Sequence, residues 1–130
     1  MPTSTYATSY GYRTVISPEI GVVEAKAWFE DIKRVVGPPH AFGQLVDLRA
    51  QRSSSGETKA IIEAAMRWVR AQGLERSAVI VSSIVTKVLI VRFAKEAGMY
   101  AYERYFDASG DPHWEDKALD WIEHGTDPDL

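Results

Sequence analysis

The spacing of apolar residues along the chain predicts alternating strands and helices. Residues 21–36 and 57–72 carry apolar side chains at helical intervals, so we expect an amphipathic helix in each. Short apolar or alternating runs are typical of strands, and they occur at residues 12–17, 42–48, 78–81 and 102–106. The run at 78–81 (AVIV) is apolar throughout, as in a strand covered on both faces.

The first two predicted helices have recognisable ends. Residues 37–39 (GPP) stop the first helix. Ser54 and Glu57 have the spacing of a capping box, which places the start of the second helix beside them. Gly73 suits the residue after its last turn, where a left-handed backbone is easiest for glycine.

Two further helices are predicted from weaker signals. Ser82 and Ser83 can cap a helix over residues 84–96, although its many β-branched residues make local propensity ambiguous. Asp111 and Pro112 match the N-cap and first position of a last helix that ends before residue 125.

This order of elements predicts a single α/β domain over residues 12–125. We expect about four strands in a mainly parallel sheet with four helices, because each helix is long enough for a crossover. Residues 1–11, which contain no charged side chain, are expected to form a flexible arm that can add an edge strand. Residues 126–130 form a short acidic tail.

Composition narrows the chemistry of the 130-residue chain. It contains no cysteine and three histidines, which excludes disulfides and thiolate metal sites. A net charge of −3 gives no general attraction to nucleic acid. No signal peptide or membrane-spanning run is recognisable, so we expect a cytoplasmic protein without membrane insertion.

The charge is unevenly distributed. From Asp107 onward there are eight acidic residues and one basic residue, whereas residues 1–106 carry 14 basic and 10 acidic residues. The acidic end is either an ordinary solvated helix or a surface for a basic partner.

Polar residues at the predicted strand ends form the candidate binding site. Ligands of open α/β sheets usually lie beyond the carboxyl ends of the strands, and free N–H groups at helix starts attract anions. Alternatively, the serines serve only as helix caps. The candidates for ligand or partner binding are Asp47, Arg49, Ser53, Ser54, Ser55, Ser82, Ser83 and Asp107.

No catalytic or metal-binding residues are assigned, and no cofactor is expected. Asp111, His113, Glu115 and Asp116 are metal-ligand types, but their spacing does not place them on one helix face. A Ser–His–Asp triad assembled in space stays open, and a hydrolase is therefore the third functional alternative.

The tryptophans allow two interpretations. All four lie on predicted inward helix faces, so a core position is the first interpretation. The second is that some of them line an apolar pocket between helices and sheet. They are Trp28, Trp68, Trp114 and Trp121.

Several core motifs resemble the SpoIIAA-like branch of the STAS superfamily, which is also grouped with SEC14-like lipid-binding folds. They are LVDLR, MRWVRAQG, SAVIVSS, RFAKEAG, ERYF and ALDWI, and they extend over roughly residues 15–122. The resemblance implies a STAS-like fold. Because the motifs are patterns of core residues, they imply no particular activity.

The resemblance implies a non-catalytic regulatory module that acts by contact with a protein partner or with a second copy of itself. Family members that antagonise anti-sigma factors carry a phosphorylatable serine before the second helix, and residues 53–56 (SSSG) occupy that position here. Ser54 and Ser55 are therefore candidate phosphorylation sites, although Arg52 stands where the family has aspartate and the loop is about two residues shorter. The alternative is a SEC14-like binder of a small apolar or anionic ligand, a lipid or a nucleotide, at the strand ends.

Overall fold

The computed structural model describes residues 3–52 and 55–130, and within them strands and helices alternate after an initial pair of strands. A short 3₁₀ helix, η1 (Met99–Ala101), precedes the last strand. The strands are β1 (Ser4–Ala7), β2 (Gly11–Val15), β3 (Phe42–Asp47), β4 (Leu74–Val81) and β5 (Glu103–Asp107). The helices are α1 (Val22–Val36), α2 (Gly56–Gln72), α3 (Ile84–Ala97) and α4 (Trp114–His124).

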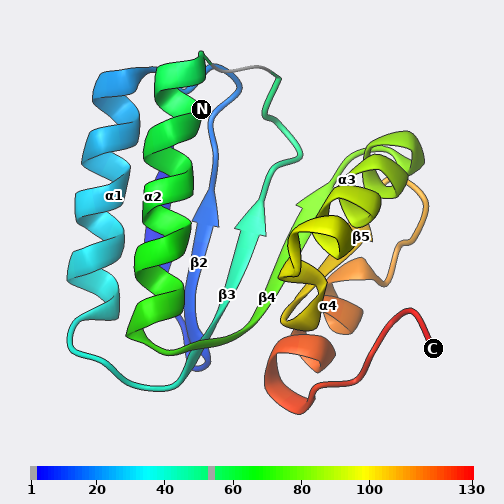
Figure 1. Cartoon of the computed structure of the whole chain (residues 1–130). Helices are drawn as coiled ribbons and strands as arrows, with labels where there is room; N and C mark the ends of the chain where they lie inside the picture. The colour runs from blue at the N-terminus through cyan, green and yellow to red at the C-terminus, as the bar shows by residue number, and fades with distance from the viewer. Residues whose placement is uncertain (1–2, 53–54) are drawn as a thin grey trace.

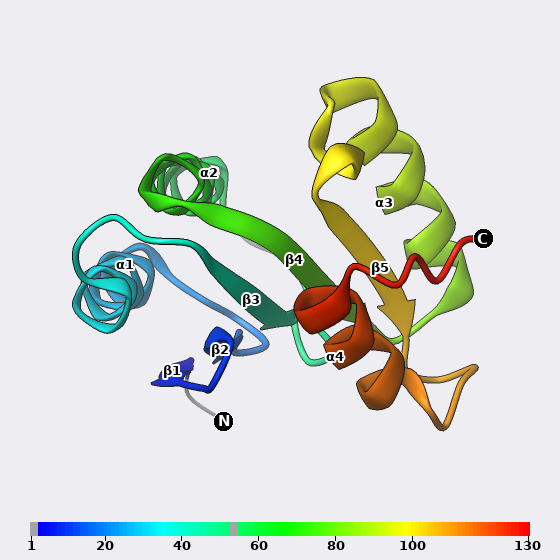
Figure 2. The same cartoon turned by 90° about the horizontal axis from the view of Figure 1, so that it is seen from below.

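The strands form one sheet in the order β1-β2-β3-β4-β5, as Figures 1 and 2 show. The pairs from β2 to β5 are all parallel, which confirms the predicted α/β class. The predicted count of about four strands is one short, because β1 adds an antiparallel edge strand to β2. The side chains of Thr5 and Thr14 join these two strands through a 2.8 Å hydrogen bond.

Helices cover both faces of the sheet, and each face has its own hydrophobic core. On one face, α1, α2 and α3 pack over the sheet around Trp28, Ile32 and Val69. On the other, α4 alone packs Trp121 and Ile122 against Leu45 and its neighbours. Figure 2 shows the three helices above the twisted sheet and α4 below it.

The three helices on the first face are unevenly spaced. α1 and α2 pack side by side, whereas the backbones of α2 and α3 do not come close to each other anywhere in the described residues. The sheet twists between them, so that the two helices diverge on either side of β4 (Figure 2). This divergence leaves the middle of the sheet incompletely covered.

Helix starts differ from the prediction in two places. Ser55, not Ser54, is the N-cap of α2, and its Oγ accepts a 3.1 Å hydrogen bond from the Thr58 N–H. α4 begins at Trp114 rather than directly after Asp111. The Asp111 carboxylate accepts from the His113 N–H at 2.8 Å and so holds a turn before the helix, as aspartates before turns commonly do.

Other boundaries follow the local signals. Ser83 caps α3 as predicted, with its Oγ 3.0 Å from the Thr86 nitrogen. Gly73 ends α2 with a φ of +123°, and a Cβ there would lie 2.0 Å from the His40 carbonyl oxygen. β4 begins at Leu74, four residues earlier than predicted, because the polar segment after Leu74 disguises the first half of the strand.

Candidate functional site

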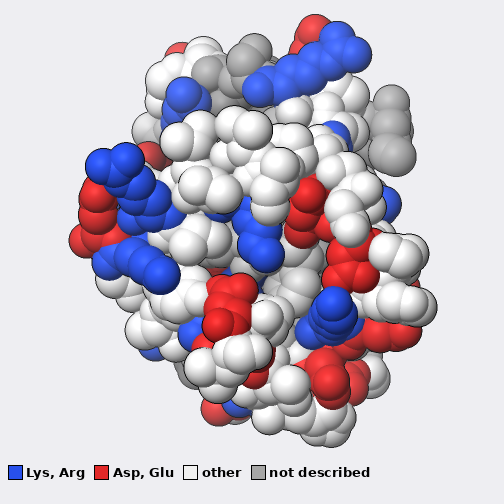
Figure 3. All heavy atoms as spheres, turned by 90° about the vertical axis from the view of Figure 1, so that its right-hand side faces the viewer, with Lys and Arg blue, Asp and Glu red and all other residues white. Residues whose placement is uncertain are grey.

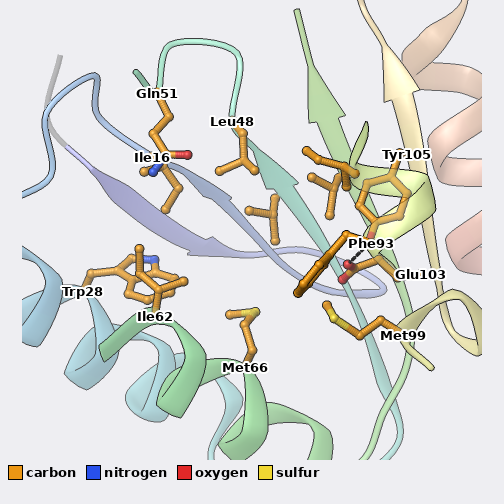
Figure 4. A pocket seen from close by; sticks show the side chains of 13 residues that line it. Ile16, Trp28, Leu48, Gln51, Ile62, Met66, Phe93, Met99, Glu103 and Tyr105 are labelled. Carbon is orange, nitrogen blue, oxygen red and sulfur yellow. Dashed lines mark hydrogen bonds between the residues drawn. The ribbon is translucent and has the colours of Figure 1, made fainter. Parts of the chain in front are cut away.

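Side chains of α2 and α3 line an apolar pocket above the middle of the sheet (Figure 4). Its volume is about 210 Å³. Ile62 and Met66 of α2 lie on one side, and Phe93 of α3 and Met99 lie on the other. Because α2 and α3 diverge, the apolar side chains of one helix do not pack against those of the other.

A wider depression of about 780 Å³ continues this pocket toward the solvent. The two hollows share Ile62, Met66, Phe93 and Met99, so we treat them as the inner and outer parts of one groove, the α2–α3 groove. The outer part has polar residues at its mouth, among them Glu63, Arg67 and Arg70. The inner part is thus mainly apolar, and charged side chains gather at the outer rim.

A row of polar side chains crosses the sheet beneath the groove. Tyr12, Gln44, Ser77 and Glu103 are aligned partners on β2, β3, β4 and β5. The Tyr12 hydroxyl donates to Gln44 Oε1, and Gln44 Nε2 donates to Ser77 Oγ at 2.8 Å. Ser77 is aligned with Glu103 on the neighbouring strand, and its hydroxyl lowers the pKa of the Glu103 carboxyl group. We call these four residues the polar ladder.

Glu103 ends the polar ladder inside the groove. Its side chain lines the inner part and is 5% exposed. Burial raises the pKa of the Glu103 carboxyl group, and hydrogen bonds from Tyr105 and Ser77 oppose part of that rise. Burial and the nearby Glu103 also raise the pKa of the Tyr105 hydroxyl, so this group remains a hydrogen-bond donor.

Two of the predicted site residues bind each other instead of facing the groove. The Asp47 carboxylate accepts hydrogen bonds from the backbone and guanidinium of Arg49, the shortest at 2.7 Å. Burial raises the pKa of Asp47, but these bonds and the Arg49 charge outweigh it and lower the pKa overall. Arg49 also lies 4.7 Å over the Trp114 ring, so the pair belongs to the α4 side of the sheet.

The predicted serines fall into three groups. Ser53 and Ser54 lie outside the described residues. Ser55 and Ser83 cap α2 and α3, and a further role of either in binding stays a prediction. Ser82 is exposed in the bend before α3. Whether Ser54 or Ser55 is phosphorylated stays a prediction.

Asp107 lies at the end of β5, away from the α2–α3 groove. Its carboxylate accepts hydrogen bonds from the Ser109 hydroxyl at 2.6 Å and the Ser109 N–H at 2.9 Å, which lower its pKa. It lines a separate polar hollow of about 240 Å³ with Lys87 and Asp111. The predicted residues are therefore spread over several places.

The histidines lie on the surface and are not grouped with acidic residues as metal ligands in the described part of the chain. All three histidines are exposed, and His40 hydrogen-bonds to the Pro38 carbonyl oxygen at 2.8 Å. Within residues 3–52 and 55–130, no three histidine or acidic side chains are grouped closely enough to hold a metal ion.

The sequence prediction missed the residues that line the groove. Trp28 is the exception, since its pocket alternative was considered: it is 3% exposed, lines the inner part, and donates to Thr14 at 2.8 Å. Glu103 and Tyr105 lie two residues apart in a predicted strand, a spacing that places both on one face. That spacing was the available signal for this site.

Comparisons with known proteins identify the architecture. No protein-family model matches the chain, and no curated protein matches it. A solved structure of an uncharacterised DUF3478-family protein with a SpoIIAA-like fold, from Shewanella loihica PV-4, is similar over 92% of this chain and 91% of that one. The TM-score is 0.64 and the sequence identity 11%. The chain has a SpoIIAA-like fold.

The SpoIIAA-like fold confirms the resemblance found in the core motifs. At 11% identity the likeness establishes the architecture alone, so regulation, partner contact and ligand binding stay proposals. The helices of the described residues are too short or too polar for any of them to cross a membrane.

Proposed function

We propose that this SpoIIAA-like domain is a non-catalytic module that binds a small apolar ligand in the α2–α3 groove. This is the ligand-binding alternative from the sequence, moved from the strand ends to the face of the sheet. The supporting observation is the groove itself, which is apolar, open to solvent and continuous from Ile16 and Leu48 to Met99.

The character of the groove lining supports a ligand rather than a simple packing defect. Phe93 is 64% exposed although it borders the apolar groove, with Met99 on its own side and Met66 on the opposite side. Methionine side chains adapt to varied apolar shapes, and an apolar hollow with a few polar groups is typical of a small-molecule site.

The first test fills the groove. Met66→Trp places a large ring between α2 and α3, and we expect it to weaken binding of the neutral apolar dye Nile red by at least about tenfold, or about 1.4 kcal/mol, because the ring occupies space that the dye needs. Dye fluorescence in a titration of the full chain measures the effect.

Val23→Trp is the matched control. Val23 lies on α1 and is 84% exposed, so the same added ring lies on a surface away from the groove. We expect this variant to bind the dye like the unmodified chain. Equal binding by both tryptophan variants, or no dye binding by the unmodified chain, would contradict the proposed function.

Exposed apolar side chains on α3 favour protein contact as a second candidate function. They are more than half exposed and occupy neighbouring turns of the helix: Ile84, Val85, Val88, Leu89 and Phe93. Figure 3 views this side of the molecule and shows an uncharged area with basic and acidic side chains around it. Lys87 borders it near Asp107, and Lys95 near Asp129.

A second copy of this chain is the partner that this surface fits best. Basic and acidic groups surround the same apolar patch, so a two-fold axis through it can set the basic groups of one copy against the acidic groups of the other. The contact would differ from the predicted one, which used residues 53–55 and the adjacent helix.

Sedimentation velocity over a concentration series tests self-association. We expect the unmodified chain to form dimers at higher concentration and Leu89→Glu to remain monomeric, because a charge at the centre of an apolar contact is strongly unfavourable. Val23→Glu adds the same charge on the exposed surface of α1 and should still dimerise. A chain that is monomeric throughout the series excludes the dimer.

A further inference from the structure

Glu103 is a buried acid without a basic partner among the described residues. Glutamate is rarely buried to this extent unless it is paired, yet no Lys, Arg or His side chain of the described residues forms an ion pair with it. Its neighbour Arg104 extends to the opposite face, where it binds Asp127 at 3.0 Å. The Glu103 carboxyl group is therefore available to a molecule in the groove.

In the hydrogen bonds around Glu103, its carboxyl group is always the acceptor. The Tyr105 hydroxyl donates to Glu103 Oε1. Because Gln44 donates to Ser77 Oγ, the Ser77 hydroxyl proton is free to point at Glu103. A carboxylate offers about four lone-pair positions, so two donors leave acceptor capacity for a ligand.

The rest of the inner groove offers no positive charge to an anion. Its described lining contains no basic side chain: Glu103 is its acid, Gln51 and Tyr105 are neutral polar residues, and most of the others are apolar. A ligand carboxylate placed there would be repelled by Glu103 in a medium of low dielectric constant, whereas a cation would be attracted. The arginines Arg67 and Arg70 lie in the outer part instead.

We propose that the groove binds an apolar amine whose protonated nitrogen donates hydrogen bonds to the Glu103 carboxylate while its hydrocarbon part lies between α2 and α3. This inference rests on the proposed groove function and names its ligand class. It differs from the lipid or nucleotide expected from the sequence, because those ligands carry acidic groups that Glu103 disfavours.

The amine should bind less well as the pH falls. The pKa of Glu103 is raised by burial, so its carboxylate becomes protonated at a higher pH than an exposed glutamate, and the attraction for a cation is lost. The titratable groups around it are Tyr12, Tyr102 and Tyr105, with Arg70 4.2 Å over the Tyr102 ring. The tyrosines have raised pKa values and stay neutral in this range.

Competition against Nile red on the full chain tests the ligand class. The competitors are octylamine, octanol and octanoate, which share one chain length and differ in the polar group. At neutral pH we expect octylamine to bind about 10- to 100-fold more tightly than octanoate, the range given by one hydrogen bond to a buried charged group. Octanol should fall between them.

Glu103→Gln removes the charge and keeps the shape of the side chain, so the preference for octylamine should disappear. Glu30→Gln is the matched control, because it removes the same charge from the exposed surface of α1, away from the groove, and should keep the preference. Octanoate binding as tight as octylamine, or a preference that survives Glu103→Gln, overturns the proposal.

Measurements on the unmodified chain decide the matter if Glu103→Gln does not fold, as judged by circular dichroism. Octylamine affinity must then fall with decreasing pH while octanol affinity stays constant, and parallel behaviour overturns the proposal. If only the amine proposal is wrong, the chain still binds Nile red and Met66→Trp still weakens that binding. If the proposed function itself is wrong, neither result is observed.

Discussion

Replacing Trp121 by alanine is expected to destabilise the domain by about 3–5 kcal/mol. The ring is 6% exposed and fills the space between α4 and the sheet. Its Nε1 donates a 3.0 Å hydrogen bond to the Ser77 carbonyl oxygen, and the Arg104 guanidinium lies 4.5 Å from its ring. Removal of the ring therefore leaves a cavity, an unpaired carbonyl oxygen and an uncovered arginine.

The effect should be large because α4 alone covers its face of the sheet. The opposite face has three helices, whereas here Trp121, Ile122 and Ala118 supply the buried helix residues. Loss of the largest of them weakens the attachment of the whole helix. Urea denaturation followed by far-ultraviolet circular dichroism measures the free energy of unfolding.

Trp114→Ala is the matched control for Trp121→Ala. Trp114 is only half-buried and packs under Arg49 at the start of the same helix, so we expect a loss of about 1 kcal/mol. A Trp121 variant that is no less stable than the Trp114 variant would contradict the assigned role of α4.

The elements that were predicted best are those with one clearly apolar face. In α1, the helical spacing marked Trp28 and Ile32, and both are buried in the core. In α3, nearly every position of the first three turns is apolar, so periodicity could not show which side meets the sheet. The structure buries Ala94 and leaves Leu89 and Phe93 exposed.

The predicted site residues and the groove residues differ because position along a strand and side-chain direction are separate properties. Strand ends were identified correctly, but successive side chains of a strand point to opposite faces. Leu48 therefore faces the α2–α3 groove, whereas Asp47 and Arg49 face α4. Glu103 is the reverse case. It lies near the start of its strand rather than at the end, yet its side chain points into the groove.

The polar ladder could not be predicted from the sequence, for a different reason. Gln44 lies within an apolar run and Ser77 at the end of a polar segment, and nothing local pairs them. They meet because the parallel register aligns Gln44 with Tyr12 on one side and with Ser77 on the other. Register between distant strands is a property of the assembled sheet rather than of either strand.

Replacing Gln44 by leucine is expected to cost about 3 kcal/mol of stability. The side chain is fully buried, and its amide group is the shared partner of the Tyr12 hydroxyl and Ser77 Oγ. Leucine fills much of the same space but leaves two buried polar groups without this partner, each at a cost of about 1–3 kcal/mol. Urea denaturation measures this loss as well.

A triple variant separates two causes of lost stability: buried polar groups left without a partner, and the loss of the hydrogen bonds themselves. Tyr12→Phe, Gln44→Leu and Ser77→Ala together remove the first three members of the ladder, and replacing all partners by apolar groups can be nearly neutral. We therefore expect the triple variant to be more stable than Gln44→Leu alone. Because contacting residues couple, the loss of stability in the triple variant should be much smaller than the sum of the losses in the three single variants.

Glu103 gives this experiment a second readout. In the triple variant Glu103 keeps the Tyr105 hydrogen bond but loses the one from Ser77, which opposed the effect of burial, so the pKa of its carboxyl group should rise further. Octylamine binding would then weaken at a higher pH than in the unmodified chain. If the triple variant is the least stable of the set, or its binding profile is unshifted, the ladder does not support Glu103 in the way inferred from its geometry.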